Sequence, residues 1–139
     1  MKKFLFVPLA LAAIVSCADD ATPEWVVEIS ASDRTLPADG SEGANITIGV
    51  SDSANGGAPA PQGTIVIMQC RDESGDPSGN FAESDSVGDV STLTDSTGLV
   101  EYRYRCGGDI GEDYTINCIA LSQGASTVLI PQIVCETLL

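Results

Sequence analysis

Residues 94–106 read Thr-Asp-Ser-Thr-Gly-Leu-Val-Glu-Tyr-Arg-Tyr-Arg-Cys, and this stretch decides the fold class. Its first part is a turn signal, because Asp95 can cap its own backbone and Gly98 adopts positive φ without steric cost. Apolar and charged residues then alternate, which is typical of a β-strand with one buried and one solvated side. The inward face would carry Val100, Tyr102, Tyr104 and Cys106, and the outward face Glu101, Arg103 and Arg105.

The chain after residue 24 continues this pattern of short strands and turns. We expect further strands at residues 24–31, 44–52, 64–70, 80–83, 89–93, 113–121 and 126–135. Clusters of Gly, Pro and Asp at residues 36–40 and 53–63 predict turns rather than regular elements. Residues 64–70 are nearly all apolar, which predicts a strand that is covered on both faces or central in its sheet. About seven short strands over roughly 110 residues indicate an all-β protein with an immunoglobulin-like (Ig-like) β-sandwich.

Residues 1–16 have the features of a lipoprotein signal peptide. Two lysines open the segment, and residues 4–15 form an apolar run of twelve residues. This run is too short for a transmembrane helix of about 20 residues but suits a signal-peptide core of roughly 7–15. The sequence Ile14-Val15-Ser16-Cys17 resembles a bacterial lipobox. That resemblance implies cleavage before Cys17 and attachment of lipid to its thiol and its amine.

A lipid on Cys17 would hold the protein at a membrane. Each buried CH₂ group contributes about 0.8 kcal/mol, so two or more acyl chains anchor a protein durably. Ala18 stands where an Asp favours inner-membrane retention in enterobacteria, so an outer-membrane location is favoured. Residues 17–24 would form a short tether, since residues 18–24 reach about 25 Å at most. The alternative is an ordinary signal peptide, with Cys17 merely the fifth cysteine.

Beyond the leader the chain is strongly acidic and contains neither histidine nor lysine. Four arginines stand against twenty acidic residues, a formal net charge of −16. This surface repels nucleic acid and anionic lipid headgroups and attracts cations or basic partners, although solubility alone also explains it. The missing residue types remove Ser-His-Asp and Cys-His nucleophiles, Schiff-base lysines and histidine metal sites. A pair of carboxylates could still act, but none is set apart by an apolar environment. We therefore expect no enzyme and no cofactor.

Four segments match a known family pattern in their order and spacing. They are residues 37–40 before the second strand, 50–52 leading into the loop at 56–63, 94–98 before the alternating strand, and 116–120. Together they resemble the bacterial Ig-like domain of the invasin and intimin type, group 1. The resemblance covers nearly the whole mature domain, and it implies an Ig-like sandwich over residues 25–135.

Four cysteines remain when Cys17 is set aside, namely Cys70, Cys106, Cys118 and Cys135. An even number in an exported chain predicts two disulfides, for which three pairings exist. If the strands follow the Ig order that the resemblance implies, the strand bearing Cys118 neighbours the strand bearing Cys70. That order favours Cys70–Cys118 with Cys106–Cys135, and Cys70–Cys106 with Cys118–Cys135 is the next alternative. A metal site of four thiolates would be expected to show C-x-x-C spacing, which the chain lacks.

The acidic segment 71–91 is a candidate cation site, because Ca²⁺ binds six to eight oxygen ligands. Its spacing matches no EF-hand, so we predict a solvated loop with at most weak cation binding. The residues concerned are Asp72, Glu73, Asp76, Glu83, Asp85 and Asp89.

Two further groups are candidates for binding. Trp25, Tyr102 and Tyr104 could form an aromatic platform for a sugar. Both tyrosines share the inward face of their strand, which favours core packing instead. Arg103 and Arg105 form a small basic patch, and we expect them to pair with acids on strand exteriors.

These features predict a non-enzymatic envelope lipoprotein, anchored through Cys17, that presents one Ig-like module for protein–protein interaction. A surface adhesin or carbohydrate-binding module is the alternative. The short tether argues against an adhesin, because an adhesin usually projects its binding surface away from the bilayer.

Overall fold

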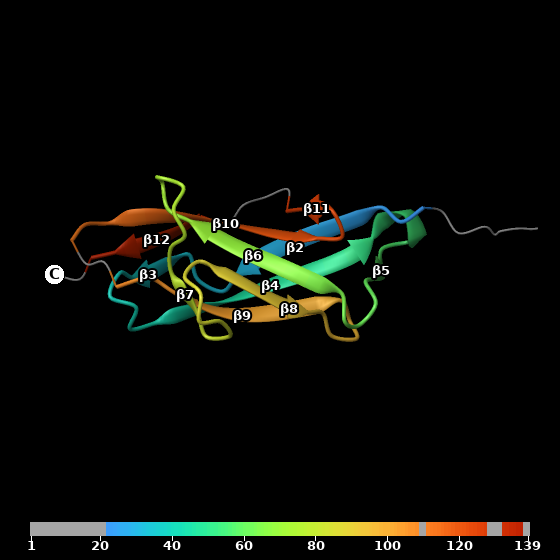
Figure 1. Cartoon of the computed structure of the whole chain (residues 1–139), viewed down its shortest axis with the longest axis horizontal. Coiled ribbons are helices and arrows are strands. Elements are labelled where there is room, and N and C mark those ends of the chain that lie inside the picture. Colours follow the sequence, from blue (N-terminus) through green and yellow to red (C-terminus); the bar gives the residue numbers. More distant parts are fainter. Residues whose placement is uncertain (1–21, 109–110, 128–131, 138–139) are drawn as a thin grey trace, which may run out of the picture.

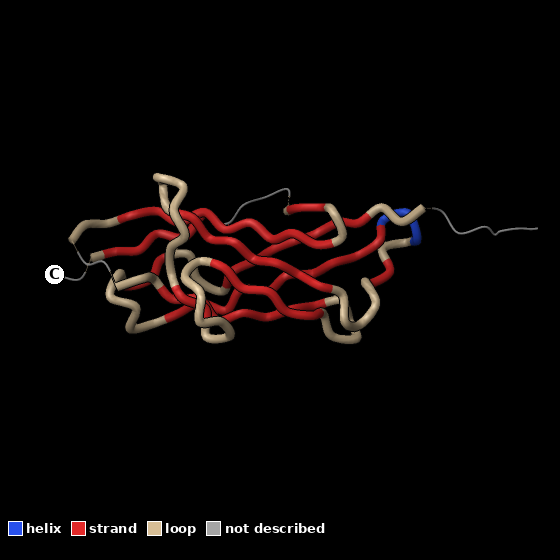
Figure 2. The backbone as a smooth tube through the Cα atoms, viewed as in Figure 1, coloured by secondary structure: helices blue, strands red, loops and turns tan. Residues whose placement is uncertain are grey.

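The computed structural model describes residues 22–108, 111–127 and 132–137. The predicted leader, the lipobox and the tether as far as residue 21 lie outside this part of the chain. Two sheets pack face to face in an elongated sandwich (Figure 1), with strands through its body and loops mainly at its ends (Figure 2). Within the described ranges, no helix has the length and apolar character that a membrane span requires.

The first sheet has the strand order β2-β4-β9-β7, and β5 pairs with β4. These strands are β2 (Trp25–Ala31), β4 (Gly43–Asp52), β9 (Leu99–Arg105), β7 (Asn80–Phe81) and β5 (Ala58–Pro59). All pairs in this sheet are antiparallel. A short 3-10 turn, η1 (Ser53–Asn55), follows β4.

The second sheet has the strand order β3-β12-β10-β6-β8, and β11 pairs with β10. These strands are β3 (Thr35–Pro37), β12 (Gln132–Glu136), β10 (Tyr114–Ser122), β6 (Ile65–Arg71), β8 (Asp89–Leu93) and β11 (Ala125–Ser126). The short β3 runs parallel to β12, and the other pairs are antiparallel.

The central strands have the order of an immunoglobulin sandwich. In the first sheet β2, β4 and β9 correspond to strands A, B and E, and in the second sheet β12, β10 and β6 correspond to G, F and C. Between C and E the chain forms β7 at the edge of the first sheet before it forms β8 beside C, whereas in variable-type domains the strand beside C precedes strand D. The predicted all-β Ig-like fold is therefore confirmed.

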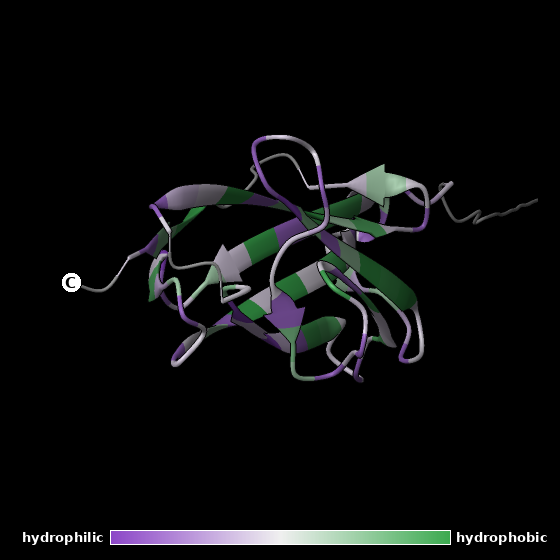
Figure 3. Cartoon of the chain, turned by 60° about the vertical axis from the view of Figure 1, so that its left-hand side comes forward, coloured by the Kyte–Doolittle hydropathy of each residue, from purple (hydrophilic) through white to green (hydrophobic). Residues whose placement is uncertain are grey.

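The period-two alternation of the strands creates the core. Ile46 lies opposite Tyr102, and Ile48 opposite Val100, on the inner face of the first sheet. Buried side chains of the core come from Val27 through Cys135, so the sandwich draws its core from within these residues. Apolar and hydrophilic residues alternate along the strands, as the colouring of Figure 3 shows.

Several elements differ from the expected strands. Residues 36–37 belong to β3 rather than to a turn, because their backbone pairs with the last strand. Residues 53–63 contain η1 and the two-residue strand β5 despite their turn-rich composition. The expected strand at 126–135 is represented by β11 and β12, and residues 128–131 between them lie outside the described chain.

Candidate functional site

The first disulfide joins neighbouring strands within one sheet. Cys70 of β6 lies directly opposite Cys118 of β10, and their Cα atoms are 4.1 Å apart. Both cysteines are buried. The backbone groups of Cys70 bond away from β10, since its N–H donates to Gly88 and its carbonyl accepts from Ser78. The pair is therefore a non-hydrogen-bonded position of the ladder, where facing Cα atoms approach most closely.

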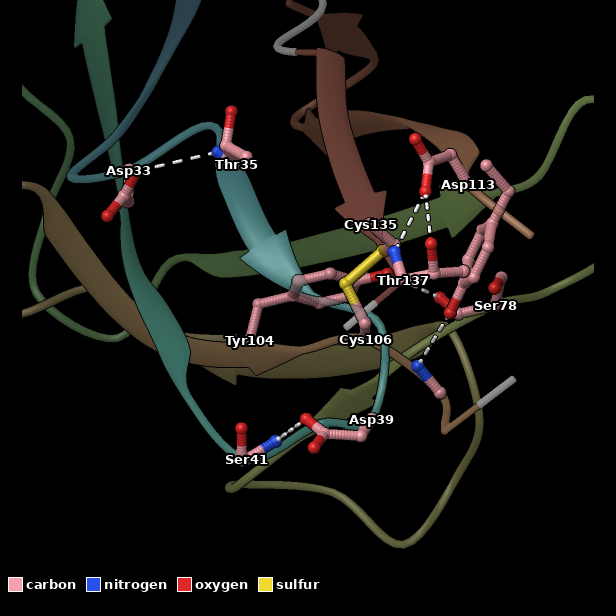
Figure 4. Close-up of a disulfide and its surroundings, with 12 residues drawn as sticks. Asp33, Thr35, Asp39, Ser41, Ser78, Tyr104, Cys106, Asp113, Cys135 and Thr137 are labelled. Carbon is pink, nitrogen blue, oxygen red and sulfur yellow. Dashed lines mark hydrogen bonds between the residues drawn. A yellow bond between two sulfur atoms is a disulfide. The ribbon is translucent and has the colours of Figure 1, made fainter. Parts of the chain in front are cut away.

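The second disulfide ties the two sheets together. Cys106 follows β9 of the first sheet, and Cys135 lies in β12 of the second, with their Cα atoms 6.0 Å apart. Figure 4 shows this bond close to the contact in which Asp113 accepts hydrogen bonds from Thr137. The two disulfides are those favoured by the expected Ig strand order.

The candidate aromatic platform is part of the core. Tyr102 and Tyr104 are fully buried, and Phe81 contacts both rings edge-on at centroid distances of 5.6 and 5.2 Å. Trp25 is half-buried against the same core. Burial, with a smaller contribution from the charge of Glu83, raises the pKa of Tyr102 to about 12. Burial also raises the pKa of Tyr104. The sugar-platform hypothesis is therefore wrong, and core packing is confirmed.

The acidic segment 71–91 does not form a shared cation site. In the described part of the chain, no group of three or more acidic or cysteine side chains converges to hold a metal ion. Asp72 accepts backbone hydrogen bonds from Ser74 and Asp76 and so closes its own turn. Asp89 pairs with Arg71 across 2.8 Å.

The two arginines of β9 bind uncharged oxygen atoms. Arg103 donates to the side-chain oxygen of Asn45 across 3.0 Å, and Arg105 donates to the carbonyl oxygen of Gly40 across 3.4 Å. Glu83 instead accepts a hydrogen bond from the backbone N–H of Arg103. Among the described side chains, the ion pair that forms is Arg71–Asp89. The expected pairing of Arg103 and Arg105 with acids is therefore wrong, because neutral acceptors on neighbouring segments lie within their reach.

The turn that precedes β9 forms as expected. Asp95 accepts hydrogen bonds from the backbone N–H groups of Thr97 and Leu99 and from the hydroxyl of Thr97. The bond from the Thr97 side chain, followed by those from the two backbone groups, lowers the pKa of Asp95. Gly98 has a φ of +76° and lies against the carbonyl of Val50. The carboxylate thus organises the turn rather than a ligand site.

Asp52 fixes the point at which the chain enters the sandwich. Its carboxylate accepts the N–H of Glu24 at 2.9 Å and the side-chain amide of Asn55 at 2.6 Å. The hydrogen bond from Glu24, then that from Asn55, lowers the pKa of Asp52. The predicted tether would therefore end on an ordered junction at Glu24.

Exposed apolar side chains gather on the second sheet, which the sequence analysis missed. Ile65 and Ile67 of β6 are 56% and 40% exposed, and Leu93 of β8 is 57% exposed. Of the two alternatives for residues 64–70, a place inside the sheet is confirmed, because β6 lies between β10 and β8. Cover on both faces is wrong, because the outer face of β6 is open to solvent.

The outer face of the first sheet carries a shallow groove of about 290 Å³. Gly49 supplies no side chain there, and Glu28, Pro59 and Leu99 line the hollow. Glu28 is the one carboxylate in this lining. Retaining and inverting glycoside hydrolases typically use a pair of carboxyl groups. The groove therefore lacks that arrangement.

No protein-family model matches the sequence, and no curated protein matches it either. Solved structures do match. The D00-D0 domain of intimin superposes with a TM-score of 0.53 and 11% identity, over 92% of this chain and 54% of that one. The chain thus spans about half the length of that structure.

Two other solved structures have lower scores. A conjugative transposon lipoprotein from Bacteroides eggerthii DSM 20697 has a TM-score of 0.45 and 13% identity, over 81% of this chain and 98% of that one. The human F-spondin reeler domain has a TM-score of 0.47 and 9% identity, over 79% of this chain and 89% of that one. At such identities the likeness to intimin shows the Ig-like fold alone.

Proposed function

We propose that this chain is a non-enzymatic bacterial envelope lipoprotein that presents a single Ig-like module for protein–protein interaction. The leader 1–16 is removed, Cys17 carries the lipid, and residues 17–24 tether the sandwich close to the outer membrane. The module belongs with the invasin and intimin group of bacterial Ig-like domains.

The cysteine pairing carries this proposal. The chain has five cysteines, and the two disulfides use four of them, so Cys17 is the fifth and belongs to neither disulfide. Two disulfides in a small domain support an oxidising location outside the cytoplasm. The odd cysteine stands at the end of the lipobox-like sequence, where lipid attachment gives it a role.

The available side chains support a binding role over catalysis. No histidine occurs in the chain, and its lysines both lie in the leader. The buried tyrosines serve the core, while Asp52 and Asp95 hold backbone N–H groups. By analogy with other Ig-like folds, we infer that a module of this kind acts through its surface.

Fractionation of cells tests the anchor. The wild-type chain is expected in the membrane fraction and to be released by detergent, whereas Cys17→Ser is expected to lose this behaviour. A matched Ser16→Ala variant keeps a small residue before the cysteine and is expected to behave as wild type. If Cys17→Ser stayed in the membrane as before, the lipoprotein assignment would have to be abandoned.

Protease treatment of intact and permeabilised cells tests which side of the envelope the module faces. Digestion on intact cells would favour the alternative of a surface adhesin or carbohydrate-binding module. Protection until permeabilisation would favour a periplasmic partner.

A further inference from the structure

The two most exposed of the large apolar side chains in the described structure face each other at the open edge of a sheet. Ile65 on β6 and Leu93 on β8 are cross-strand partners, 56% and 57% exposed. Strand β8 is the last strand of its sheet, with β6 on one side. Ile67, 40% exposed, continues the apolar row toward Leu121 on β10. Apolar side chains clustered in this way mark an interaction site more often than single ones do.

The outer side of the opposite sheet provides a contrast within the same molecule. There the outward positions of β2 and β9 carry Glu28, Glu101, Arg103 and Arg105. On the outward side of β6 and β8, Arg71 and Asp89 are the charged residues, and they neutralise each other. In a chain with twenty acidic residues, this edge is thus set apart by its apolar character.

The backbone of β8 has hydrogen-bonding groups directed away from the sheet. The N–H of Cys70 donates to Gly88, and the N–H of Thr94 donates to Thr64. Hydrogen-bonded positions alternate along an antiparallel pair, so Val90 and Thr92 also bond toward β6. The N–H and C=O groups of residues 89, 91 and 93 therefore point to the far side of β8. Such an edge can accept a further strand.

Acidic residues flank both ends of this edge and indicate the charge of its occupant. Asp95 follows Leu93, and Asp85 precedes Asp89. Both residues are exposed. A segment with basic ends complements them, whereas a second copy of this chain would bring the same acidic groups together.

We propose that β8 binds an extended segment of a partner protein, with apolar residues at its centre and Lys or Arg at its ends, as an added strand. This inference rests on the proposed function of the chain as an interaction module. The segment's main chain bonds to residues 89, 91 and 93. Its apolar side chains lie beside Leu93 and extend the apolar row that Ile65 begins.

A peptide probe tests the proposal with residues 18–139, which contain the whole core between Val27 and Cys135. The probe is fluorescein-labelled Lys-Lys-Val-Leu-Thr-Leu-Val-Lys-Lys, and its counterpart carries Glu in place of Lys. We expect the lysine peptide to bind in a polarisation titration and the glutamate peptide to bind at least about tenfold more weakly. Leu93→Ser is expected to weaken binding of the lysine peptide about tenfold. The control is Leu99→Ser, which changes a 43% exposed leucine on the opposite sheet and is expected to leave the affinity for the lysine peptide unchanged.

Amide hydrogen exchange of the complex separates strand addition from other binding. We expect the peptide to slow exchange at residues 91 and 93, while Val90 and Thr92 are already protected in the free protein. Ser91→Pro removes an outward N–H and is expected to weaken binding without loss of the Val90 protection.

Three results would overturn the proposal. The first is no binding of the lysine peptide, the second is equal weakening by Leu93→Ser and Leu99→Ser, and the third is exchange protection elsewhere. Sedimentation showing a dimer that Leu93→Ser abolishes would assign the edge to a second copy instead. Membrane anchoring is measured separately by fractionation, so failure here leaves the lipoprotein assignment standing.

Discussion

The hydroxyl of Tyr104 donates a hydrogen bond across 2.9 Å to the carbonyl oxygen of Ser78, which ties β9 to the segment between β6 and β7. The same tyrosine occupies the space beside Gly79, where an added Cβ would overlap the ring. Gly79 also has a φ of +89°. The position of the Tyr104 ring therefore requires a residue without a side chain at position 79.

Replacing this glycine should destabilise the sandwich more than replacing a nearby one. Gly79→Ala adds a clash with Tyr104 to the cost of positive φ. Gly75→Ala is the matched control, because its φ is +86° and nothing lies within 4 Å of an added Cβ. In urea titrations, we expect the free energy of unfolding of Gly79→Ala to be about 1–3 kcal/mol lower than that of Gly75→Ala. Equal values would show that the tyrosine yields without cost.

Tyr104→Phe removes the hydroxyl and leaves the Ser78 carbonyl without this donor. We expect the free energy of unfolding to fall by about 1–3 kcal/mol. Tyr114→Phe is the control, since the Tyr114 hydroxyl accepts a bond from the N–H of Gly107 at an exposed site. Loss of the Tyr114 hydroxyl should lower the free energy of unfolding less in the same urea titration. A larger decrease for Tyr114→Phe than for Tyr104→Phe would contradict the stabilising role of the Tyr104–Ser78 hydrogen bond.

Alkaline pH should destabilise the fold through the buried tyrosines. An unfolded tyrosine ionises near pH 10, whereas burial raises the pKa of Tyr102 to about 12. Below about pH 10 Tyr102 keeps its proton in both the folded and the unfolded protein, so the stability that depends on the protonated tyrosine is fully present. Above that pH the unfolded state loses its proton first, and stability falls as the pH rises through the folded pKa.

Urea midpoints measured from about pH 9 to pH 12 check this expectation, with absorbance at 295 nm reporting tyrosine ionisation. Tyr102→Phe should make the midpoint less dependent on pH across that window. Parallel curves for the variant and the wild type would count against Tyr102 as the source.

Each disulfide should stabilise the domain substantially. The bonds close loops with sequence separations of 48 for Cys70–Cys118 and 29 for Cys106–Cys135. Chain entropy gives about 3–4 kcal/mol for loops of this size. We expect each double replacement by alanine to lower the free energy of unfolding by about this amount, measured in urea without reductant. A loss below about 1 kcal/mol for either pair would show that packing alone holds that region.

The sequence predicted those elements whose residues carry their own period or their own turn. Alternation located β4, β9 and β10 to within a residue or two, and Asp95 and Gly98 marked the turn before β9. The turn is decided by hydrogen bonds between near neighbours in the chain, and in the strands the period of the sequence already shows which side chains face the core.

The features that sequence reasoning missed depend on distant segments. Residues 36–37 became a strand because their backbone pairs with β12. The exposure of Ile65 depends on whether anything covers the outer face of β6, which composition does not specify. Arg103 found the amide of Asn45 on a neighbouring strand rather than a carboxylate. The exposed edge could have been suspected only from the apolar residues at positions 65, 67 and 93.

The most direct test of the proposed lipoprotein is intact-mass spectrometry of the chain purified from bacterial membranes. We expect a mass that lacks residues 1–16, carries acyl groups on Cys17 and has lost four hydrogens to two disulfides. Tandem fragmentation should assign the lipid to Cys17. An unmodified Cys17, whether on a cleaved or an uncleaved chain, would contradict the proposed anchor and with it the placement of this module at the membrane.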